Sequence, residues 1–337
     1  MLSNKRGDMP TLHRLGSALA SLAFFAALAG AASVQAQTLT TAPSRLTSAF
    51  PTGSGPDVVA RLLADKLGAQ WKQPVIVDAK PGGAGVLAIN AMKRLAPTGN
   101  ELVVVDVGNL AINPLIFKNL GYNPETELVP VALVYKTAFF VAVAADSKIK
   151  SIKDLLAEAG KPGSKLSYGS NAVGGPIHLG SARLESALGA EMLHVPYKET
   201  SQLYAAVSTG EVSWAYASIA SAGPLLRGNR LRFLAVADQA RSPALPDVPT
   251  LEEAGGPKGM DALTWVAIMA PAGTPAAVVS DINQAVNEAL AKPDVKEKMA
   301  SFGFVASPLS AAQVGELMRS DRARYAEVLK RVKVSVD

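Results

Sequence analysis

The chain has 337 residues, of which 49% are hydrophobic and 18% charged, with a formal net charge of +5 and no cysteine. This composition is typical of a well-packed globular protein, so it excludes an intrinsically disordered chain, and the lack of cysteine excludes a disulfide framework. The basic residues are scattered, without a Lys/Arg block or a basic-aromatic stripe, which disfavours nucleic-acid binding.

The first 36 residues have the pattern of a secretory signal peptide. A basic start is followed by an apolar run over 15–32 and by a small-residue cleavage pattern at 34–36. The run is short and rich in small residues for a membrane anchor, which is the alternative interpretation. We therefore expect the mature chain to begin at Gln37 and to be exported.

Two glycine-rich loops come next, each between a predicted strand and a predicted helix. The first covers 51–57 (PTGSGPD) and the second covers 80–85 (KPGGAG). Glycine permits positive φ and a close approach of the backbone to a ligand. The start of a helix offers unpaired N–H groups and a partial positive charge. Two such loops side by side would cradle an anion without any basic side chain.

The rest of the chain alternates strand-like apolar runs with segments of helical periodicity. The predicted strands are 75–77, 102–105, 139–143, 166–168, 192–195, 212–216 and 231–236. The main predicted helices are 59–67, 86–92, 151–159, 179–188, 275–290 and 310–330. A third glycine-bearing loop covers 169–176. The alternation predicts α/β units with mostly parallel sheets.

The sequence lacks the usual catalytic patterns. The mature part has only two histidines, His178 and His194, and no cysteine, which disfavours a transition-metal site. It contains no G-x-S-x-G, no phosphate-binding P-loop and no G-x-G-x-x-G. We therefore expect a protein that is not an enzyme and that carries neither a metal nor a cofactor.

Two polar residues beside the loops have both a structural and a ligand-binding interpretation. Asp57 begins the helix after the first loop, where a carboxylate stabilises the helix dipole by about 0.3–1 kcal/mol and can accept the N–H bonds of the loop. His178 falls in the first turn after the third loop, where a capping or supporting role is favoured over donation to a ligand. His194 lies in a predicted strand and is interpreted as structural.

Several short segments share their order and spacing with one known family. They are 50–61 (FPTGSGPDVVAR), 80–85 (KPGGAG), 111–114 (AINP), 168–170 (YGS), 194–198 (HVPYK), 245–250 (LPDVPT) and 270–275 (APAGTP). Together they resemble the Bug receptors, the periplasmic solute-binding proteins of tripartite tricarboxylate transporters. The ordered set spans essentially the whole mature chain and is more specific than any single segment.

The resemblance implies an α/β, two-lobed periplasmic binding protein of type II, the Venus-flytrap architecture, with a hinge and an interlobe cleft. It places the signal peptide at 1–36, the first lobe at 37–141 plus 267–337, and the second lobe at 142–266. The chain would cross between the lobes near Ala138–Ala144 and near Trp265–Ala270. The implied protein is a periplasmic monomer.

The resemblance also implies that the first two loops hold a ligand carboxylate through backbone N–H groups and ordered water. The implied backbone donors are Thr52, Gly53, Ser54, Gly83, Ala84 and Gly85. The full set of implied ligand-binding residues adds Asp57, Asn109, Ser170, Asn171, Gly174, Gly175, His178, Ala217 and Ser218.

One departure from the family pattern bears on the ligand. Ala217 stands where many relatives carry aspartate, and alanine offers no partner for a ligand amino group. The hypothesis is a ligand without an ammonium group: a dicarboxylate, a hydroxy acid or an aromatic acid. Ser54, Leu110 and Glu199 also differ from the usual residues of the family.

The function that these features imply is capture of a small carboxylate for the membrane subunits of a tripartite tricarboxylate-type transporter. A sensor that presents the ligand to a signalling partner would have the same cleft and stays open as an alternative. A secreted α/β enzyme is the third alternative, although the chain offers no catalytic constellation for it.

Overall fold

The computed structural model describes Met1, residues 42–332 and residue 334. Apart from Met1, the predicted signal peptide lies outside the described residues. The chain divides into a unit over Met1–Thr38 and a larger unit over Leu39–Asp337, and every element described below belongs to the larger unit. Within the part that the structure describes, no helix has the length and apolar character needed to span a membrane.

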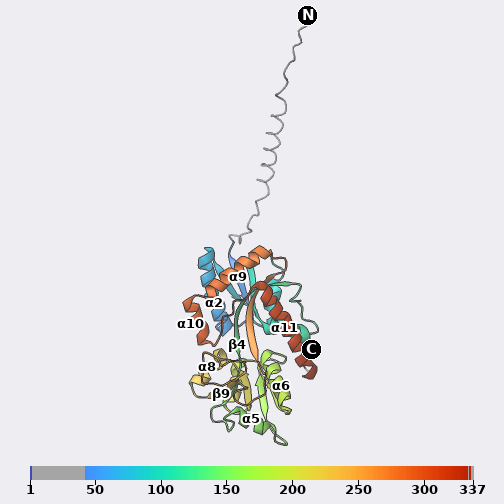
Figure 1. The fold of residues 1–337 in the computed structure, drawn as a ribbon, viewed down its shortest axis with the longest axis vertical. Helices are drawn as coiled ribbons and strands as arrows, with labels where there is room; N and C mark the ends of the chain where they lie inside the picture. Colours follow the sequence, from blue (N-terminus) through green and yellow to red (C-terminus); the bar gives the residue numbers. More distant parts are fainter. Residues whose placement is uncertain (2–41, 333, 335–337) are drawn as a thin grey trace. The chain divides into compact units, whose positions relative to one another are not determined.

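The first sheet has five strands in the order β2-β1-β3-β10-β4 (Figure 1). Its strands are β1 (Ser44–Ser48), β2 (Val75–Ala79), β3 (Glu101–Asp106), β4 (Leu128–Ala138) and β10 (Leu263–Pro271). β1 runs parallel to β2 and β3, whereas β10 runs antiparallel to β3 and β4.

The second sheet also has five strands, in the order β7-β6-β8-β5-β9. They are β5 (Phe140–Ala144), β6 (Ser167–Ser170), β7 (Leu193–Pro196), β8 (Trp214–Ala217) and β9 (Leu231–Val236). β6 is parallel to β7 and β8, and β5 is antiparallel to β8 and β9. Both sheets are therefore mixed. The prediction of mostly parallel sheets holds for four of the five strands in each sheet, which share one direction. The exceptions are β10 and β5, which enter their sheets from the other one and run against their neighbours.

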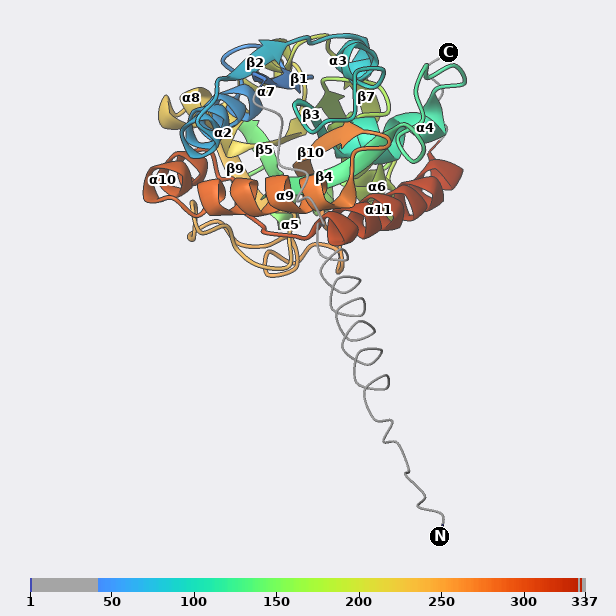
Figure 2. The same cartoon turned by 90° about the horizontal axis from the view of Figure 1, so that it is seen from above.

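Helices follow most strands, as the alternation predicts (Figure 2). The helices are α2 (Gly55–Trp71), α3 (Val86–Met92), α4 (Asn113–Ile116), α5 (Ile152–Ala159), α6 (Pro176–Leu188), α7 (Thr200–Ser208), α8 (Ile219–Arg227), α9 (Ala276–Leu290), α10 (Pro293–Ser301) and α11 (Ala311–Arg331). α11 begins at a capping box in which Ser310 and Gln313 bond each other's backbone, which confirms the predicted start of that helix.

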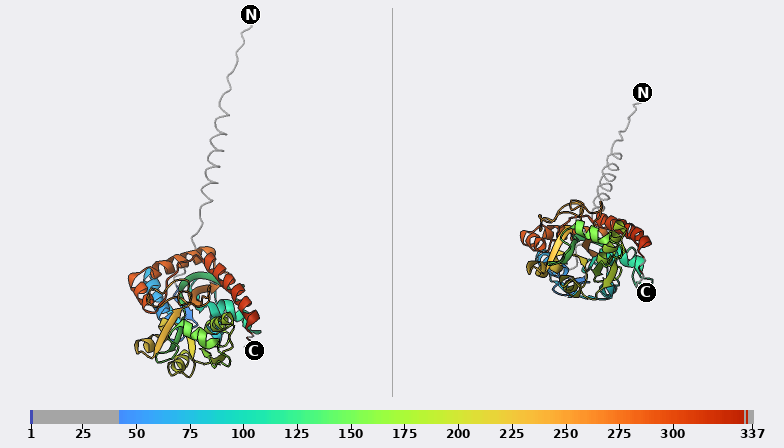
Figure 3. Two further views of the ribbon diagram at one scale, coloured as in Figure 1. Left: turned by 60° about the horizontal axis from the view of Figure 1, so that its bottom comes forward. Right: turned by 90° about the horizontal axis from the view of Figure 1, so that it is seen from below.

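Each sheet is packed into a body of its own, and we call these bodies the first and second lobes. In the first lobe, α9, α10 and α11 pass along the outside of the sheet, while α5 to α8 belong to the second lobe (Figures 1 and 3). Leu46 and Ile282 are fully buried in the first lobe, and Trp214 and Tyr216 in the second. Burying one such apolar side chain contributes about 1.5–3 kcal/mol. Each lobe therefore has a core of its own, and a third cluster joins Leu179 of α6 to the first lobe.

The chain crosses between the sheets at two points. β4 ends at Ala138 and β5 begins at Phe140, so Phe139 alone joins them, at the start of the predicted segment 138–144. The return crossing lies between the end of β9 and the start of β10. At this junction Phe139 N donates to Ala262 O at 2.9 Å, and Ala237 N donates to Phe139 O at 2.8 Å. The two connections are therefore hydrogen-bonded to each other.

The predicted second crossing near Trp265–Ala270 does not match this path. That segment lies inside β10, which pairs with β3 and β4 of the first sheet over its length. The lobe boundaries expected at 141/142 and 266/267 likewise cut through β5 and β10. The segment is apolar because it is a buried central strand, and sequence alone does not separate such a strand from a hinge.

Candidate functional site

A cavity of about 1020 Å³ lies between the two lobes and is lined by both glycine-rich loops. On the first lobe its walls come from these loops and from the facing parts of β3, β4 and β10. On the second lobe they come from the third loop and from the segments that begin α6, α7 and α8. The volume is at the upper end of what ligand sites usually have.

The first loop is ordered by the carboxylate of Asp57, which is only 1% exposed. Asp57 Oδ2 accepts the N–H of Gly53 at 2.8 Å and the Nε–H of Arg61 at 3.0 Å. Ser54 N donates to Pro51 O at 3.1 Å. Asp57 does not line the cavity, so its place beneath the loop matches the structural interpretation of this residue.

The second loop has an unusual backbone, because four successive residues, Gly82 to Gly85, have positive φ. A side chain at Gly85 would clash with Asn109, so glycine is required there for space as well as for φ. Ala84 has φ 49° and ψ 39°, a left-handed conformation that costs about 1–2 kcal/mol for a residue with a side chain. Its carbonyl accepts hydrogen bonds from Asn109 Nδ2 at 2.7 Å and from Asn113 Nδ2 at 2.8 Å.

Asn109 itself is held from behind by a buried tyrosine. Tyr122 Oη donates to Asn109 O at 2.7 Å, and Asn113 Nδ2 donates to Tyr122 Oη at 3.3 Å. Burial raises the pKa of the Tyr122 hydroxyl above its usual range. Two asparagines and a protonated tyrosine therefore fix the carbonyl of Ala84 on the side of the loop away from its N–H.

These bonds change the predicted set of backbone donors. Gly53 and Ser54 donate within the first loop, and Gly85 N donates to Gly82 O at 3.0 Å. Each loop uses these three N–H groups to hold its own turn, and their contact with a ligand stays a prediction. Within the described residues no acceptor is found for the predicted donors Thr52, Gly83 and Ala84, nor for Gly55 in the first turn of α2.

The third loop is supported by the two histidines. Gly174 N donates to His178 Nδ1 at 2.9 Å, and the His178 ring stacks on His194 with 3.9 Å between centroids. His194 Nε2 and Ser170 Oγ are 2.7 Å apart. Burial and the neighbouring His194 lower the pKa of His178 to about 4, so His178 is neutral at pH 7 and can accept. This geometry matches the supporting role expected of His178.

At the second-lobe wall, Asn171 and Ser218 line the cavity, whereas Ala217 does not. Asn171 Nδ2 donates to Thr200 Oγ1 at 3.1 Å, and Ser218 Oγ accepts the N–H of Ser221 at 3.3 Å as the N-cap of α8. The methyl group of Ala217 is fully buried. Ala217 therefore offers no group to the cavity, and neighbouring residues such as Ser218 form the wall there.

The structure brings part of the predicted set to the cavity surface and places the rest behind it. The residues of the set that line the cavity are Gly53, Ser54, Ala84, Gly85, Asn109, Asn171 and Ser218. Those outside the lining are Thr52, Asp57, Gly83, Ser170, Gly174, Gly175, His178 and Ala217.

The floor of the cavity was missed by sequence reasoning. The rings of Tyr135 and Phe304 stack 3.8 Å apart at 4°, with Thr137 and Thr264 beside them in the lining. These four residues come from strand interiors and from a turn. A sequence pattern predicts such an element, but it does not predict which face of the element opens to a cavity. Asp106 is the exception, because an acidic residue ending the apolar run 102–105 was a visible signal.

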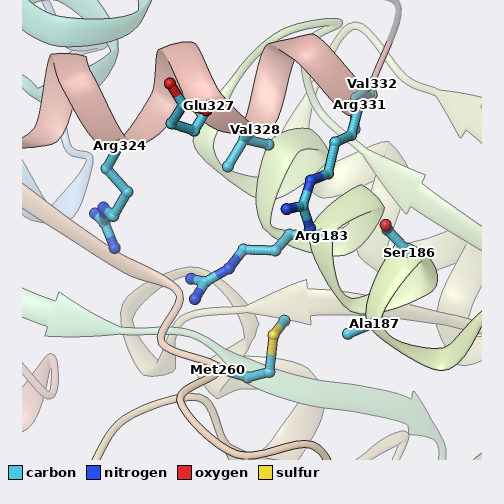
Figure 4. A pocket seen from close by; sticks show the side chains of 9 residues that line it. All are labelled: Arg183, Ser186, Ala187, Met260, Arg324, Glu327, Val328, Arg331 and Val332. Carbon is cyan, nitrogen blue, oxygen red and sulfur yellow. The ribbon is translucent and has the colours of Figure 1, made fainter.

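A second cavity, of about 360 Å³, lies between α6 and α11 (Figure 4). Arg183 and Arg324 reach into it, but both pair with Asp261 at 2.7 Å. Both guanidinium groups are therefore already paired with a carboxylate. No residue of a glycine-rich loop lines this cavity. The cavity between the lobes is therefore the candidate site.

Comparison with known proteins agrees with this geometry. The sequence model described as TctC, tripartite tricarboxylate transporter family receptor, matches residues 59–334. The chain belongs to the tripartite tricarboxylate transporter receptor family. Protein BugT of Bordetella pertussis is 30% identical over 314 residues, which cover 93% of this chain and 96% of BugT.

Solved structures of the same kind share the fold. R. palustris Rpa4515 with adipate is 27% identical, with a TM-score of 0.79 over 87% of this chain and 98% of that one. MatC (Rpa3494) from Rhodopseudomonas palustris with bound malate is 26% identical, with a TM-score of 0.74 over 85% and 98%. This member of the receptor family therefore has the two-lobed α/β fold of periplasmic binding proteins, and its family consists of solute-binding receptors.

Proposed function

We propose that this receptor captures a small carboxylate in the periplasm and delivers it to the membrane subunits of a tripartite tricarboxylate-type transporter. The observation that carries the proposal is the pair of glycine-rich loops on one cavity wall, where the N–H groups of Gly55 and Ala84 have no acceptor within the described residues. N–H donors make stronger hydrogen bonds to a carboxylate than to a neutral acceptor.

The relatives support a carboxylate as the ligand. Two family members of similar fold are described with adipate and with malate, and both are small dicarboxylates. The sequence pattern of 1–36 supports export, and the absence of a catalytic constellation in the sequence supports a binding role without chemistry. We further propose that the receptor works as a monomer.

Binding would be coupled to closure of the lobes. The cavity of about 1020 Å³ is much larger than one small acid, so a ligand on the first lobe can gain contacts with the second lobe only if the walls approach. These extra contacts favour the closed form. The hydrogen-bonded junction of Phe139, Ala237 and Ala262 is the place where such a motion would pivot.

The test is to identify what the receptor carries. Protein exported to the periplasm and isolated gently is examined by native mass spectrometry, and the released compound is then titrated back by calorimetry. The proposal expects a small carboxylate with a dissociation constant in the micromolar range or below. A ligand without any carboxylate, or turnover of the bound compound, would contradict it.

A further inference from the structure

An acidic side chain stands between the two loops of the candidate site. Asp106 ends β3 and lines the cavity. Along one edge of β3, Ala49 N donates to Val104 O at 3.1 Å, which brings the start of the first loop beside it. Towards the second loop, the Asn109 side chain bonds both Asp106 and Ala84, accepting from Asp106 N at 3.1 Å and donating to Ala84 O at 2.7 Å.

Only part of this carboxylate is used inside the protein. Asp106 Oδ1 accepts the N–H of Asn109 at 3.0 Å. Within the described residues, Oδ2 has no hydrogen-bond donor and Asp106 belongs to no ion pair. Burial raises its pKa, and the backbone N–H groups of Asn109, Gly108 and Asp106 itself offset only part of that rise.

The other charged side chains of the cavity do not compensate Asp106. Lys198 and Glu199 line the second-lobe wall, are both exposed and are adjacent in sequence with opposite charges. Lys80, beside the second loop, pairs with Asp78 at 3.0 Å. An anion held at Ala84 would therefore share the cavity wall with a carboxylate that has no ion-pair partner within the described residues.

We infer that the ligand carries, near its captured carboxylate, a hydroxyl or ammonium group that donates to Asp106. The inference rests on the proposed function and narrows it from carboxylates in general to hydroxy or amino acids. Asp106 then determines specificity: a ligand with the donor pairs with Oδ2, and a ligand without it covers this part-buried acceptor without pairing it. An ammonium group, which the hypothesis drawn from Ala217 excludes, has an acceptor on this other wall.

The experiment compares acids that differ only in the donor. Three matched series are titrated by calorimetry: succinate, malate and aspartate; glutarate, 2-hydroxyglutarate and glutamate; propionate, lactate and alanine. The wild-type receptor is expected to bind the substituted member of at least one series about 10- to 100-fold more tightly than its parent. The comparison of the hydroxylated acids with the aminated acids shows whether a hydroxyl or an ammonium group donates to Asp106.

The variant Asp106→Asn tests the residue itself. Asparagine can still accept the N–H of Asn109 through its oxygen, so the fold is retained, but its NH₂ then faces the ligand donor. The preference for the substituted acid is expected to fall to about threefold or less. The control is Asp238→Asn, a part-buried carboxyl group outside the cavity lining, which should keep the wild-type preference.

Four results would overturn the inference. Equal or tighter binding of the parent acids by the wild type shows that no donor is required. An unchanged preference in folded Asp106→Asn shows that another residue accepts from the ligand donor. If the receptor binds only the parent acids, and Asp106→Asn still binds them, the carboxyl group acts as a hydrogen-bond donor. A wild type that binds none of the acids contradicts the proposed function as well.

Discussion

The loops of the first-lobe wall offer main-chain N–H groups to the cavity, whereas the second-lobe wall presents side-chain hydroxyl and amide groups. Gly55 and Ala84 stand on the first wall, and Asn171, Ser218 and Ser221 on the second. Main-chain donors in a rigid turn are already oriented, and side-chain donors must be ordered on binding. The comparison teaches that the first wall is built to capture an anion and the second to complete the contacts after closure.

The support behind the two walls differs as well. Asp57, Asn109 and Asn113 hold the first wall through bonds to backbone atoms. The second wall is supported by a neutral histidine pair, in which His178 accepts a loop N–H. The second support requires an imidazole without a proton, because His178 Nδ1 accepts the Gly174 N–H.

The largest effect is expected from a charge placed in the first wall. Ala84→Asp puts a carboxylate in the cavity at the anion position and is expected to weaken carboxylate binding by at least about 100-fold. Ala84→Asn is the matched control, because asparagine tolerates the left-handed backbone and has the same size without the charge. Calorimetry on both variants checks this, and similar affinities would show that the anion binds elsewhere.

The pH prediction concerns the second wall. Burial and the neighbouring His194 lower the pKa of His178 to about 4 from its usual value of about 6.5, and the Tyr168 ring also stacks near His178. The unfolded chain therefore binds a proton at higher pH than the folded one. Stability is full above about pH 6.5 and falls between pH 6.5 and 4, by up to about 3 kcal/mol.

Chemical denaturation of wild type and His178→Gln across this pH range measures that contribution. The wild type should lose more free energy of unfolding than the variant as the pH falls, because glutamine has no proton to take up. Parallel curves would show that the His178 ring is not the group that titrates, and would remove the proposed difference between the two supports.

A smaller effect is expected when the support of the first wall is loosened. Asn109→Ala removes one of the two bonds to the Ala84 carbonyl and should weaken binding about tenfold. Asn113→Ala removes the other bond, but Asn113 does not line the cavity, so the loss of affinity should be smaller. Equal losses, measured by calorimetry, would mean that Asn109 supports the loop and has no additional role at the cavity.

The smallest effect is expected at the cation nearest the second loop. Lys80 is half-exposed and pairs with Asp78, and main-chain N–H groups are proposed to hold the anion. Lys80→Ala should change the affinity by about twofold or less, because an exposed charge pair contributes little. A loss as large as that of Ala84→Asp would mean that side-chain charge, rather than the backbone, distinguishes the two walls.

The sequence could predict the features that depend on local residue patterns. The glycine-rich loops, the capping box at Ser310 and the helix after each loop follow from residue types at fixed spacing. The placing of Asp57 under its loop also follows from local chemistry, since a carboxylate in a first turn faces free N–H groups.

Features that depend on the fold could not be read in this way. β10 is antiparallel in the middle of the first sheet because the chain returns from the second lobe, and nothing local encodes that direction. The same holds for the stacked rings of Tyr135 and Phe304, which come from distant segments. The internal use of the Gly53 and Gly85 N–H groups requires the actual turn geometry, which a glycine pattern alone does not define.

The central claim, that main-chain N–H groups at two helix starts hold the carboxylate, is tested most directly by a crystal structure of the receptor with its copurified acid. We expect carboxylate oxygens about 3 Å from the nitrogen atoms of Gly55 and Ala84, with the second lobe closed over the ligand. A carboxylate bound instead to Lys198, with those two N–H groups facing only water, would contradict the claim.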